Sequence, residues 1–342
     1  MSVRKVGYLE EFEVREAILE SNTSSVSILS FGAITKNWRI CVDGSIIPIL
    51  LGFDSLAAYQ ADKNFIGIIA GRVANRVNRG RFNLNGVEYY LSLNDYPHHL
   101  HGGLVGFGKR NWNLEFDSKN CAVQLTYVSG HLEEGYPGVV DVKVIVGLEG
   151  NTLTYEMVAI PDRPTPISLA LHNYYNLMGS GTIGNHTIES IARCYTPTDK
   201  TLIPTGEIAD LKNFRKSFGE SKWDLRRPKT FHQLDMEKMG IDINLVMPVQ
   251  RDMKSPIARV ISQTGLILEI CSDQPGLQFY SGKNLSSDYV GHNGEKYKAF
   301  AGFCLEPQKF PSSITIPSFP SIVCTPEHPY KQVTVVKVSN SK

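Results

Sequence analysis

The chain has 342 residues, of which 42% are hydrophobic and 20% charged, and 35 Lys and Arg against 34 Asp and Glu give a formal net charge of +1. This balance argues against a nucleic-acid-binding protein, and no apolar run approaches the length that would cross a membrane. The start of the chain lacks the apolar segment of a signal peptide, and the six scattered cysteines include no Cys-x-x-Cys pair. We therefore expect a cytoplasmic protein with reduced thiols.

Alternation of apolar and polar residues recurs from end to end and predicts β-strands. Two dipeptides, Asn85-Gly86 and Gly150-Asn151, separate neighbouring strand patterns and predict tight hairpins. One short helix is expected near 54–60, and 210–239 is expected to be a long irregular excursion. Short strands with turn signals predict an all-β fold, a large antiparallel sandwich in a single domain of residues 1–342. The predicted strands are 26–35, 81–84, 87–91, 122–129, 139–148, 152–160, 266–272 and 332–339.

Three of the nine histidines lie within residues 94–103, directly before Gly102-Gly103. If this stretch is extended, His99 and His101 share one face and His98 lies on the other. Histidines on a sheet face suggest a polar ligand. The alternatives are a surface loop of solvated histidines and a metal site, since His99-Leu100-His101 matches a His-x-His metal pattern.

Other candidate residues are spread along the chain. Residues 71–80 combine three arginines with two asparagines, which suit a dense cluster of sugar hydroxyls or simply a solvated basic strand. His172 lies in an apolar and aromatic run, and Glu306 follows an apolar strand, where burial would raise its pKa and favour a role as base. Residues 179–184 match G-x-G-x-x-G by letter, but no strand–helix context surrounds them, so we expect a turn.

Several motifs occur together in one order. They are Gly-Arg-Val-Ala-Asn-Arg-Val at 71–77, Leu-His-Gly-Gly at 100–103, Glu-Glu-Gly-Tyr-Pro-Gly at 133–138, His-Asn-Tyr-Tyr-Asn-Leu at 172–177, Leu-Ile-Pro-Thr-Gly-Glu at 202–207, Gln-Pro-Gly-Leu-Gln-Phe-Tyr-Ser-Gly at 274–282 and Gly-Phe-Cys-Leu-Glu at 302–306. In these motifs the chain resembles the aldose 1-epimerases, or galactose mutarotases, and in particular their fungal members. The resemblance extends from about Val26 to Val338.

That resemblance implies the β supersandwich of galactose mutarotases and an isomerase that interconverts the α and β anomers of aldohexoses such as galactose and glucose. It implies Glu306 as general base and His172 as general acid, with no metal and no cofactor. It implies that His101 is the functional histidine, while His98 and His99 are local to this sequence and dispensable for turnover. The expected partners are a small aldose but no nucleic acid and no membrane, in a monomer or homodimer. The implied sugar-binding residues are Asn75, Arg76, His101, Tyr174, Asp242 and Gln278.

Three other functions stay open. A catalytically silent protein on the same fold would bind sugar without speeding anomer exchange. A phosphosugar mutarotase would need an extra basic cluster, for which Arg215 with Lys216 or Arg226 with Arg227 are candidates. A metalloenzyme built on His99 and His101 is the third.

Overall fold

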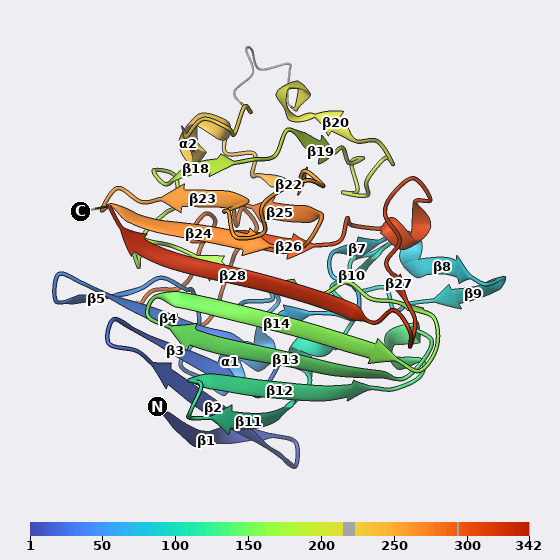
Figure 1. Cartoon of the computed structure of the whole chain (residues 1–342), viewed down its shortest axis with the longest axis horizontal. Coiled ribbons are helices and arrows are strands. Elements are labelled where there is room, and N and C mark those ends of the chain that lie inside the picture. Colours follow the sequence, from blue (N-terminus) through green and yellow to red (C-terminus); the bar gives the residue numbers. More distant parts are fainter. Residues whose placement is uncertain (215–222, 293, 342) are drawn as a thin grey trace.

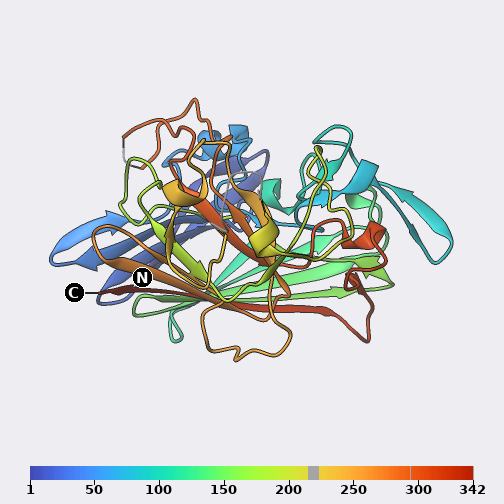
Figure 2. The ribbon, with the colours of Figure 1, turned by 90° about the horizontal axis from the view of Figure 1, so that it is seen from above.

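The computed structural model describes residues 1–214, 223–292 and 294–341. Its largest sheet has nine antiparallel strands in the order β11-β12-β13-β14-β28-β24-β23-β18-β21 (Figure 1). The sheet is the lower layer in Figure 2, and most of the remaining chain lies above it. Its strands are β11 (Asn113–Asp117), β12 (Ala122–Ser129), β13 (Val140–Glu149), β14 (Thr152–Pro161), β18 (Thr187–Ser190), β21 (Lys229–Thr230), β23 (Ala258–Ile261), β24 (Leu266–Ser272) and β28 (Tyr330–Asn340).

Two further sheets lie over this layer, one of six strands in the order β17-β26-β25-β22-β19-β20 and one of five in the order β1-β2-β3-β4-β5. The six-stranded sheet contains β17 (Tyr174–Tyr175), β19 (Cys194–Thr196), β20 (Ala209–Asp210), β22 (Asp242–Val246), β25 (Gly276–Tyr280) and β26 (Phe303–Gln308). The five-stranded sheet contains β1 (Ser2–Leu9), β2 (Phe12–Glu20), β3 (Ser24–Leu29), β4 (Thr35–Val42) and β5 (Ser45–Pro48).

Four two-stranded pairs and a few short helices complete the described fold. The pairs are β6 (Ile69–Ala70) with β16 (Ala170–Leu171), β7 (Arg76–Val77) with β10 (His99–Leu100), β8 (Arg81–Leu84) with β9 (Val87–Tyr90), and β15 (Thr165–Pro166) with β27 (Val323–Cys324). The α-helices are α1 (Leu56–Ala61) and α2 (Phe231–Leu234), and the 3₁₀ turns are 78–80, 107–109, 133–135, 211–213 and 313–315. In the part of the chain that the structure describes, no helix is long and apolar enough to cross a membrane.

Most sequence-based expectations for the fold are confirmed. The predicted strands at 122–129 and 266–272 coincide with β12 and β24, and the Asn85-Gly86 turn joins β8 to β9 in the hairpin that projects from one edge in Figure 1. The expected strand at 26–35 is wrong in its second half. Gly32 and Ala33 have φ of 65° and 48°, so β3 ends at Leu29 and the chain turns before β4.

The alternation that predicted the strands also builds the core. In β13, Val140, Val142 and Val144 are buried while Asp141 and Lys143 are exposed, so one face of the large sheet is dry and the other wet. One cluster of buried apolar side chains includes members of all three larger sheets, for example Leu19 of β2, Val144 of β13 and Phe279 of β25. The sandwich is therefore held by apolar packing between its layers.

The expected irregular excursion at 210–239 is confirmed where the structure describes it. It contains the end of β20, one 3₁₀ turn, β21 and the single turn of α2. The helix begins at a capping box in which the Thr230 hydroxyl accepts from Gln233 N and the Gln233 side chain accepts from Thr230 N. Arg215 and Lys216 lie outside the described residues.

Candidate active site

A cavity of about 420 Å³ contains every residue predicted for the site. Its lining includes Glu306, His172, Asn75, Arg76, His101, Tyr174, Asp242 and Gln278. These residues come from positions far apart in the chain, so the fold gathers what the motifs separate.

One wall of the cavity is the six-stranded sheet. Glu306 lies in β26 directly opposite Gln278 in β25, and Asp242 begins the next strand, β22. The Gln278 side chain donates through Nε2 to the carboxylate of Asp242. Tyr174 in β17 pairs with Cys304 in β26 on the other side. Regular antiparallel register therefore brings these side chains to one surface.

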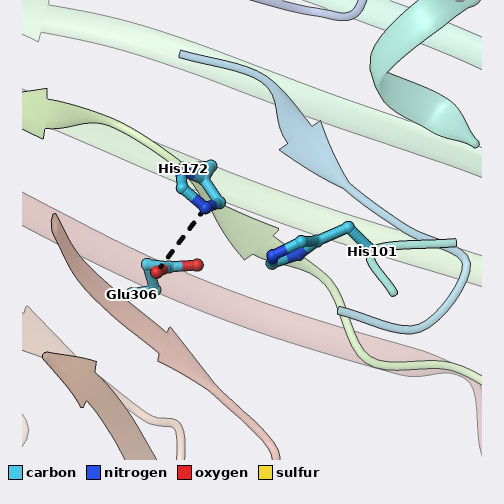
Figure 3. A group of neighbouring side chains, drawn as sticks. All are labelled: His101, His172 and Glu306. Carbon is cyan, nitrogen blue, oxygen red and sulfur yellow. Dashed lines mark ion pairs between the residues drawn. The ribbon is translucent and has the colours of Figure 1, made fainter. Parts of the chain in front are cut away.

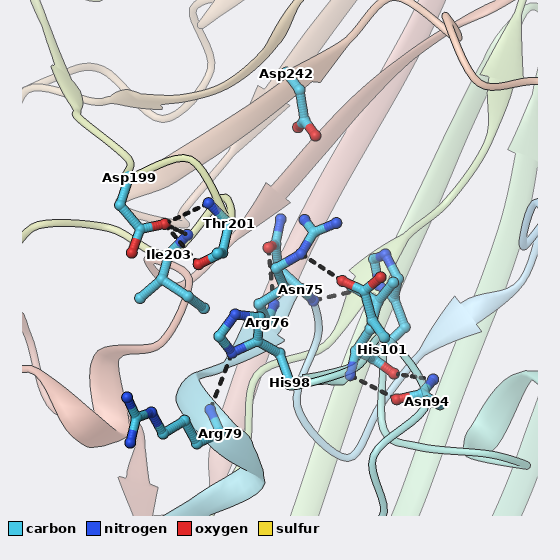
Figure 4. Close-up of polar contacts among 12 residues, drawn as sticks. Asn75, Arg76, Arg79, Asn94, His98, His101, Asp199, Thr201, Ile203 and Asp242 are labelled. Carbon is cyan, nitrogen blue, oxygen red and sulfur yellow. Dashed lines mark hydrogen bonds and ion pairs between the residues drawn. The ribbon is translucent and has the colours of Figure 1, made fainter.

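Loops form the opposite wall, where β7 pairs with β10 (Figure 4). Asn75 and His101 flank this pair and have φ of 61° and 50°. Their backbones are joined by a bond from His101 N to Asn75 O of 3.1 Å. Gly102 follows with φ of 88°, and a Cβ there would lie 1.7 Å from the carbonyl oxygen of Gly71. Only glycine permits this close approach, which holds the loop that carries His101.

Glu306 and His172 both line the cavity, and their side chains face each other (Figure 3). Glu306 Oε1 lies 3.9 Å from His172 Nε2, and both side chains are almost fully buried, at 2% and 5% exposed. At this distance the two groups are not hydrogen-bonded, so each remains available to a ligand between them. Among the described residues, Glu306 Oε2 and Gln278 Oε1 are buried with no hydrogen-bond partner. Unpaired buried oxygens are costly, and a ligand rich in hydroxyl groups would satisfy them.

Burial shifts the protonation of this pair in opposite directions. Loss of solvent, followed by the charge of Asp242, raises the pKa of Glu306 well above its usual value. Burial lowers the pKa of His172 to about 4. Between these two pKa values the pair therefore holds one proton, and the shifts favour Glu306 as its carrier when no ligand is bound.

The neighbours of His172 and His101 orient both rings. Cys304 Sγ lies 3.7 Å from His172 Nδ1, so Nε2 is the nitrogen that faces the cavity. His101 Nδ1 accepts a 3.3 Å bond from Asn75 N, and burial holds the pKa of His101 well below its usual value. A neutral His101 that accepts at Nδ1 carries its proton on Nε2. It therefore presents a hydrogen-bond donor to the cavity.

That tautomer bears on the possibility of a metal site. His101, His172 and Glu306 place one potential ligand atom each within 4.8 Å of one another (Figure 3). A metal needs the lone pair of an imidazole nitrogen, and on the cavity side of His101 that position holds a proton. The donor set therefore suits hydrogen bonding to a sugar better than metal binding.

The expected pairing of His99 with His101 on one face is wrong. The left-handed conformation at His101 breaks the two-residue period, so the two rings point apart. His99 is fully buried, and its nitrogens bond to Ser92 O and Tyr136 Oη, each at 2.7 Å. His98 Nδ1 accepts from Arg79 N at 3.0 Å. Neither ring lines the cavity, so the three histidines have three different roles.

The arginines of residues 71–80 also separate. Arg72 is 2% exposed and donates to the backbone oxygens of Pro137, Gly138 and Gly130, which is a structural role. Arg76 alone of the three lines the cavity. The expected sugar-binding character of this segment therefore belongs to Arg76 and Asn75.

Several residues of the lining were not predicted. Asp95 lies in the stretch 94–103, Leu202 in the motif at 202–207 and Tyr280 in the motif at 274–282. Their position in these motifs was therefore a signal that could have identified them. Nothing in the sequence marks Lys63 or Asn64. Arg226, a candidate for a phosphate cluster, is paired with Asp224 at 2.7 Å and does not line this cavity. The unpredicted lining residues are Lys63, Asn64, Phe65, Asp95, Leu100, Leu202, Tyr280, Asn284 and Ser286.

Comparisons with known proteins agree on the family. The family model described as aldose 1-epimerase matches residues 17–337. Galactose mutarotase of Rattus norvegicus is 36% identical over 338 residues, which are 97% of this chain and 95% of that protein. Aldose 1-epimerase of Escherichia coli is 30% identical over 321 residues, 90% of each chain.

Solved structures agree on the fold. The crystal structure of an aldose epimerase homologue from C. elegans superimposes with a TM-score of 0.87 at 27% identity, over 96% of this chain and 100% of that one. The crystal structure of galactose 1-epimerase from Lactobacillus acidophilus gives a TM-score of 0.85 at 23% identity, over 100% and 99%. The expected galactose mutarotase-like sandwich is thereby confirmed, whereas the likeness to fungal members stays a prediction. By the extent of its sequence match, the chain belongs to the aldose 1-epimerase family.

Proposed function

We propose that this protein interconverts the α and β anomers of free aldohexoses such as galactose and glucose by opening and closing the sugar ring. The observation that carries the proposal is the buried pair of Glu306 and His172, 3.9 Å apart in a cavity lined with hydrogen-bonding side chains. The names of the relatives, galactose mutarotase and aldose 1-epimerase, support the same reaction.

In the proposed mechanism the proton that the pair shares is on His172 when the sugar reacts, which leaves Glu306 ionised. Glu306 takes the proton of the hydroxyl on C1, and His172 donates its proton through Nε2 to the ring oxygen. Both oxygens are bonded to C1, so the base and the acid must lie close together, as these two side chains do. The C1–ring oxygen bond breaks and leaves an open-chain aldehyde. Rotation about C1–C2 presents the other face of the carbonyl, and the reverse proton transfers close the other anomer.

The residues around the pair would bind the sugar and stabilise charge. Arg76 and the Nε2–H of His101 are donors for the ring oxygen and neighbouring hydroxyls, while Asp242 and Gln278 offer acceptors on the sheet wall. Each well-placed acid or base contributes roughly 10²- to 10⁴-fold in rate. No step of this mechanism calls on a metal or a cofactor.

Two further proposals concern the molecule as a whole. The apolar core shared by the three larger sheets supports residues 1–342 as a single domain. The six free cysteines support a cytoplasmic protein. We further propose that it acts on a small sugar as a monomer or homodimer.

Polarimetry tests the proposed reaction. Freshly dissolved α-D-galactose and α-D-glucose should approach their equilibrium rotation faster with the protein than without it, in proportion to protein concentration. Calorimetry with the same sugars and polarimetry with sugar phosphates distinguish the alternatives. Binding without any acceleration would identify a catalytically silent sugar-binding protein, and acceleration confined to sugar phosphates would identify a phosphosugar mutarotase.

A further inference from the structure

Arg76, a donor in the mechanism above, forms an ion pair with Asp95, to which that mechanism gives no part. Arg76 Nε donates to Asp95 Oδ2 at 2.7 Å, and both side chains line the cavity. Arg76 is 15% exposed and Asp95 38% exposed, so the carboxylate lies on the solvent side of the pair. Because the bond uses Nε, the two terminal amino groups of the guanidinium stay unpaired among the described residues.

Asp95 is itself held by a tight turn. Its backbone exchanges two hydrogen bonds with His98, from Asp95 N to His98 O at 3.2 Å and from His98 N to Asp95 O at 2.8 Å. The Asn94 side chain closes the same loop through bonds to the backbone of Leu100 and Gly103 (Figure 4). These hydrogen bonds hold the backbone of Asp95 in place, and the Asp95 carboxylate in turn holds the Arg76 guanidinium.

Charge is the second part of the argument. A free arginine fork is the usual protein ligand for carboxylate and phosphate groups. Here Asp95 already neutralises Arg76, and Asp242 adds a further carboxyl group to the same cavity. The guanidinium can therefore serve as a donor to neutral hydroxyls. A ligand with its own negative charge is repelled by Asp95, the more exposed member of the pair.

We propose that Asp95 positions Arg76 and sets the charge specificity of the site: it holds the guanidinium by Nε so that the terminal amino groups face an uncharged aldose, and its own charge disfavours sugars that carry a carboxylate or phosphate. This inference rests on the proposed function. It predicts that the two effects of Asp95 can be separated by substitution.

Asp95→Asn and Asp95→Ala separate them. The Asn amide oxygen can still accept from Arg76 Nε, so kcat on galactose should fall less in Asp95→Asn than in Asp95→Ala. The KM of Asp95→Asn for D-galacturonate and D-galactose 6-phosphate should fall by roughly three- to tenfold, because one repelling charge is gone. Asp95→Ala also loses the tether, so its kcat on galactose should fall by about tenfold with a smaller change in KM.

Asp117→Asn is the matched control, since Asp117 lies on an exposed strand end of the large sheet and lines no part of the cavity. It should change neither the kinetics on galactose nor the discrimination against anionic sugars. Circular dichroism confirms that each variant is folded, and Asp95→Asn keeps the test valid if Asp95→Ala does not fold.

Two kinds of failure are distinguishable. If the unaltered protein speeds anomer exchange but Asp95→Asn and the unaltered protein discriminate equally against anionic sugars, the charge role of Asp95 is wrong and the enzyme proposal stands. If the unaltered protein binds galactose without speeding exchange, the proposed function is wrong, and calorimetry on the same variants decides the role of Asp95 by affinity. An unchanged kcat in a folded Asp95→Ala would overturn the positioning role.

Discussion

The two walls of the cavity are built in different ways. On the sheet wall, Gln278 and Glu306 face the ligand space because antiparallel register places them opposite each other. On the loop wall, Asn75 and His101 reach it from left-handed backbone conformations, next to a glycine contact that tolerates no Cβ. The sheet wall offers the carboxyl groups of Glu306 and Asp242, whereas the loop wall offers most of the donors and the carboxylate of Asp95. Substitutions on the sheet wall should therefore change chemistry alone, whereas those on the loop wall should change chemistry and shape together.

Glu306→Gln should give the largest effect and tests the sheet wall most directly. The amide keeps the size of the side chain but cannot accept a proton, so kcat should fall by roughly 100-fold or more, about 3 kcal/mol in barrier. The melting temperature should not fall, since Glu306 Oε2 has no partner to lose among the described residues. Polarimetry and thermal unfolding of one preparation measure both.

The matched control is Glu156→Gln, an exposed carboxylate on β14, which should leave turnover unchanged. A Glu306→Gln variant with a normal rate per folded molecule and a lower melting temperature would remove Glu306 from the mechanism.

The pH dependence of kcat/KM should be bell-shaped, because the reaction needs one proton shared between Glu306 and His172. Activity should rise as pH increases through about 4, the lowered pKa of His172, because below it the pair holds a second proton. It should fall again at high pH, beyond the raised pKa of Glu306, when the last proton leaves. Each limb should change the rate by up to tenfold per pH unit. Activity that keeps rising through the alkaline range would count against His172 as the acid.

Arg76→Lys tests the loop wall. Lysine keeps the charge but cannot bond Asp95 through Nε and also present two amino groups to the sugar. We expect kcat to fall about tenfold, with a smaller rise in KM, because the lost contacts matter most in the transition state. Steady-state polarimetry over a range of galactose concentrations measures both constants. If only KM changes, Arg76 is a binding residue and no more.

The smallest effect on turnover should come from His98 and His99, which lie beside the loop wall but outside the cavity. His99→Ala removes two buried hydrogen bonds, to Ser92 O and Tyr136 Oη, and should lower the free energy of unfolding by roughly 2–3 kcal/mol. His98→Ala loses one bond and should cost less. Turnover per folded molecule should stay within a few-fold in both. Loss of activity in well-folded His98→Ala would show that the turn around His98 does more than support the loop.

The sequence predicted the large sheet better than either wall of the cavity, for a physical reason. Strands of the large sheet such as β12 and β24 have a two-residue period that local pattern reveals. Of the short strands of the sheet wall, only the apolar strand before Glu306 was predicted, and Glu306 itself was identified by the motif at 302–306. The shared face expected for His99 and His101 is wrong because the backbone of His101 is left-handed rather than extended, and the alternation of residue types does not reveal a positive φ.

Contacts between loops were the hardest to foresee. Asp95 belongs to the histidine-rich stretch at 94–103, but the sequence did not predict its bond to Arg76. That bond depends on the pairing of β7 with β10, which only the folded chain provides. Lys63 and Asn64 line the cavity without any motif around them. The motifs thus identify residues that bear chemistry, while the residues that hold or shield them depend on tertiary packing.

The place of β28 has a consequence for how the protein is made. This last strand lies inside the large sheet, between β14 and β24, and pairs with both along most of its length. During synthesis the sheet cannot close until residues 330–340 have left the ribosome, so β14 and β24 present open hydrogen-bonding edges to the cell in the meantime. We therefore expect the nascent chain to depend on chaperones until β28 has emerged, and a chain truncated before β28 to aggregate.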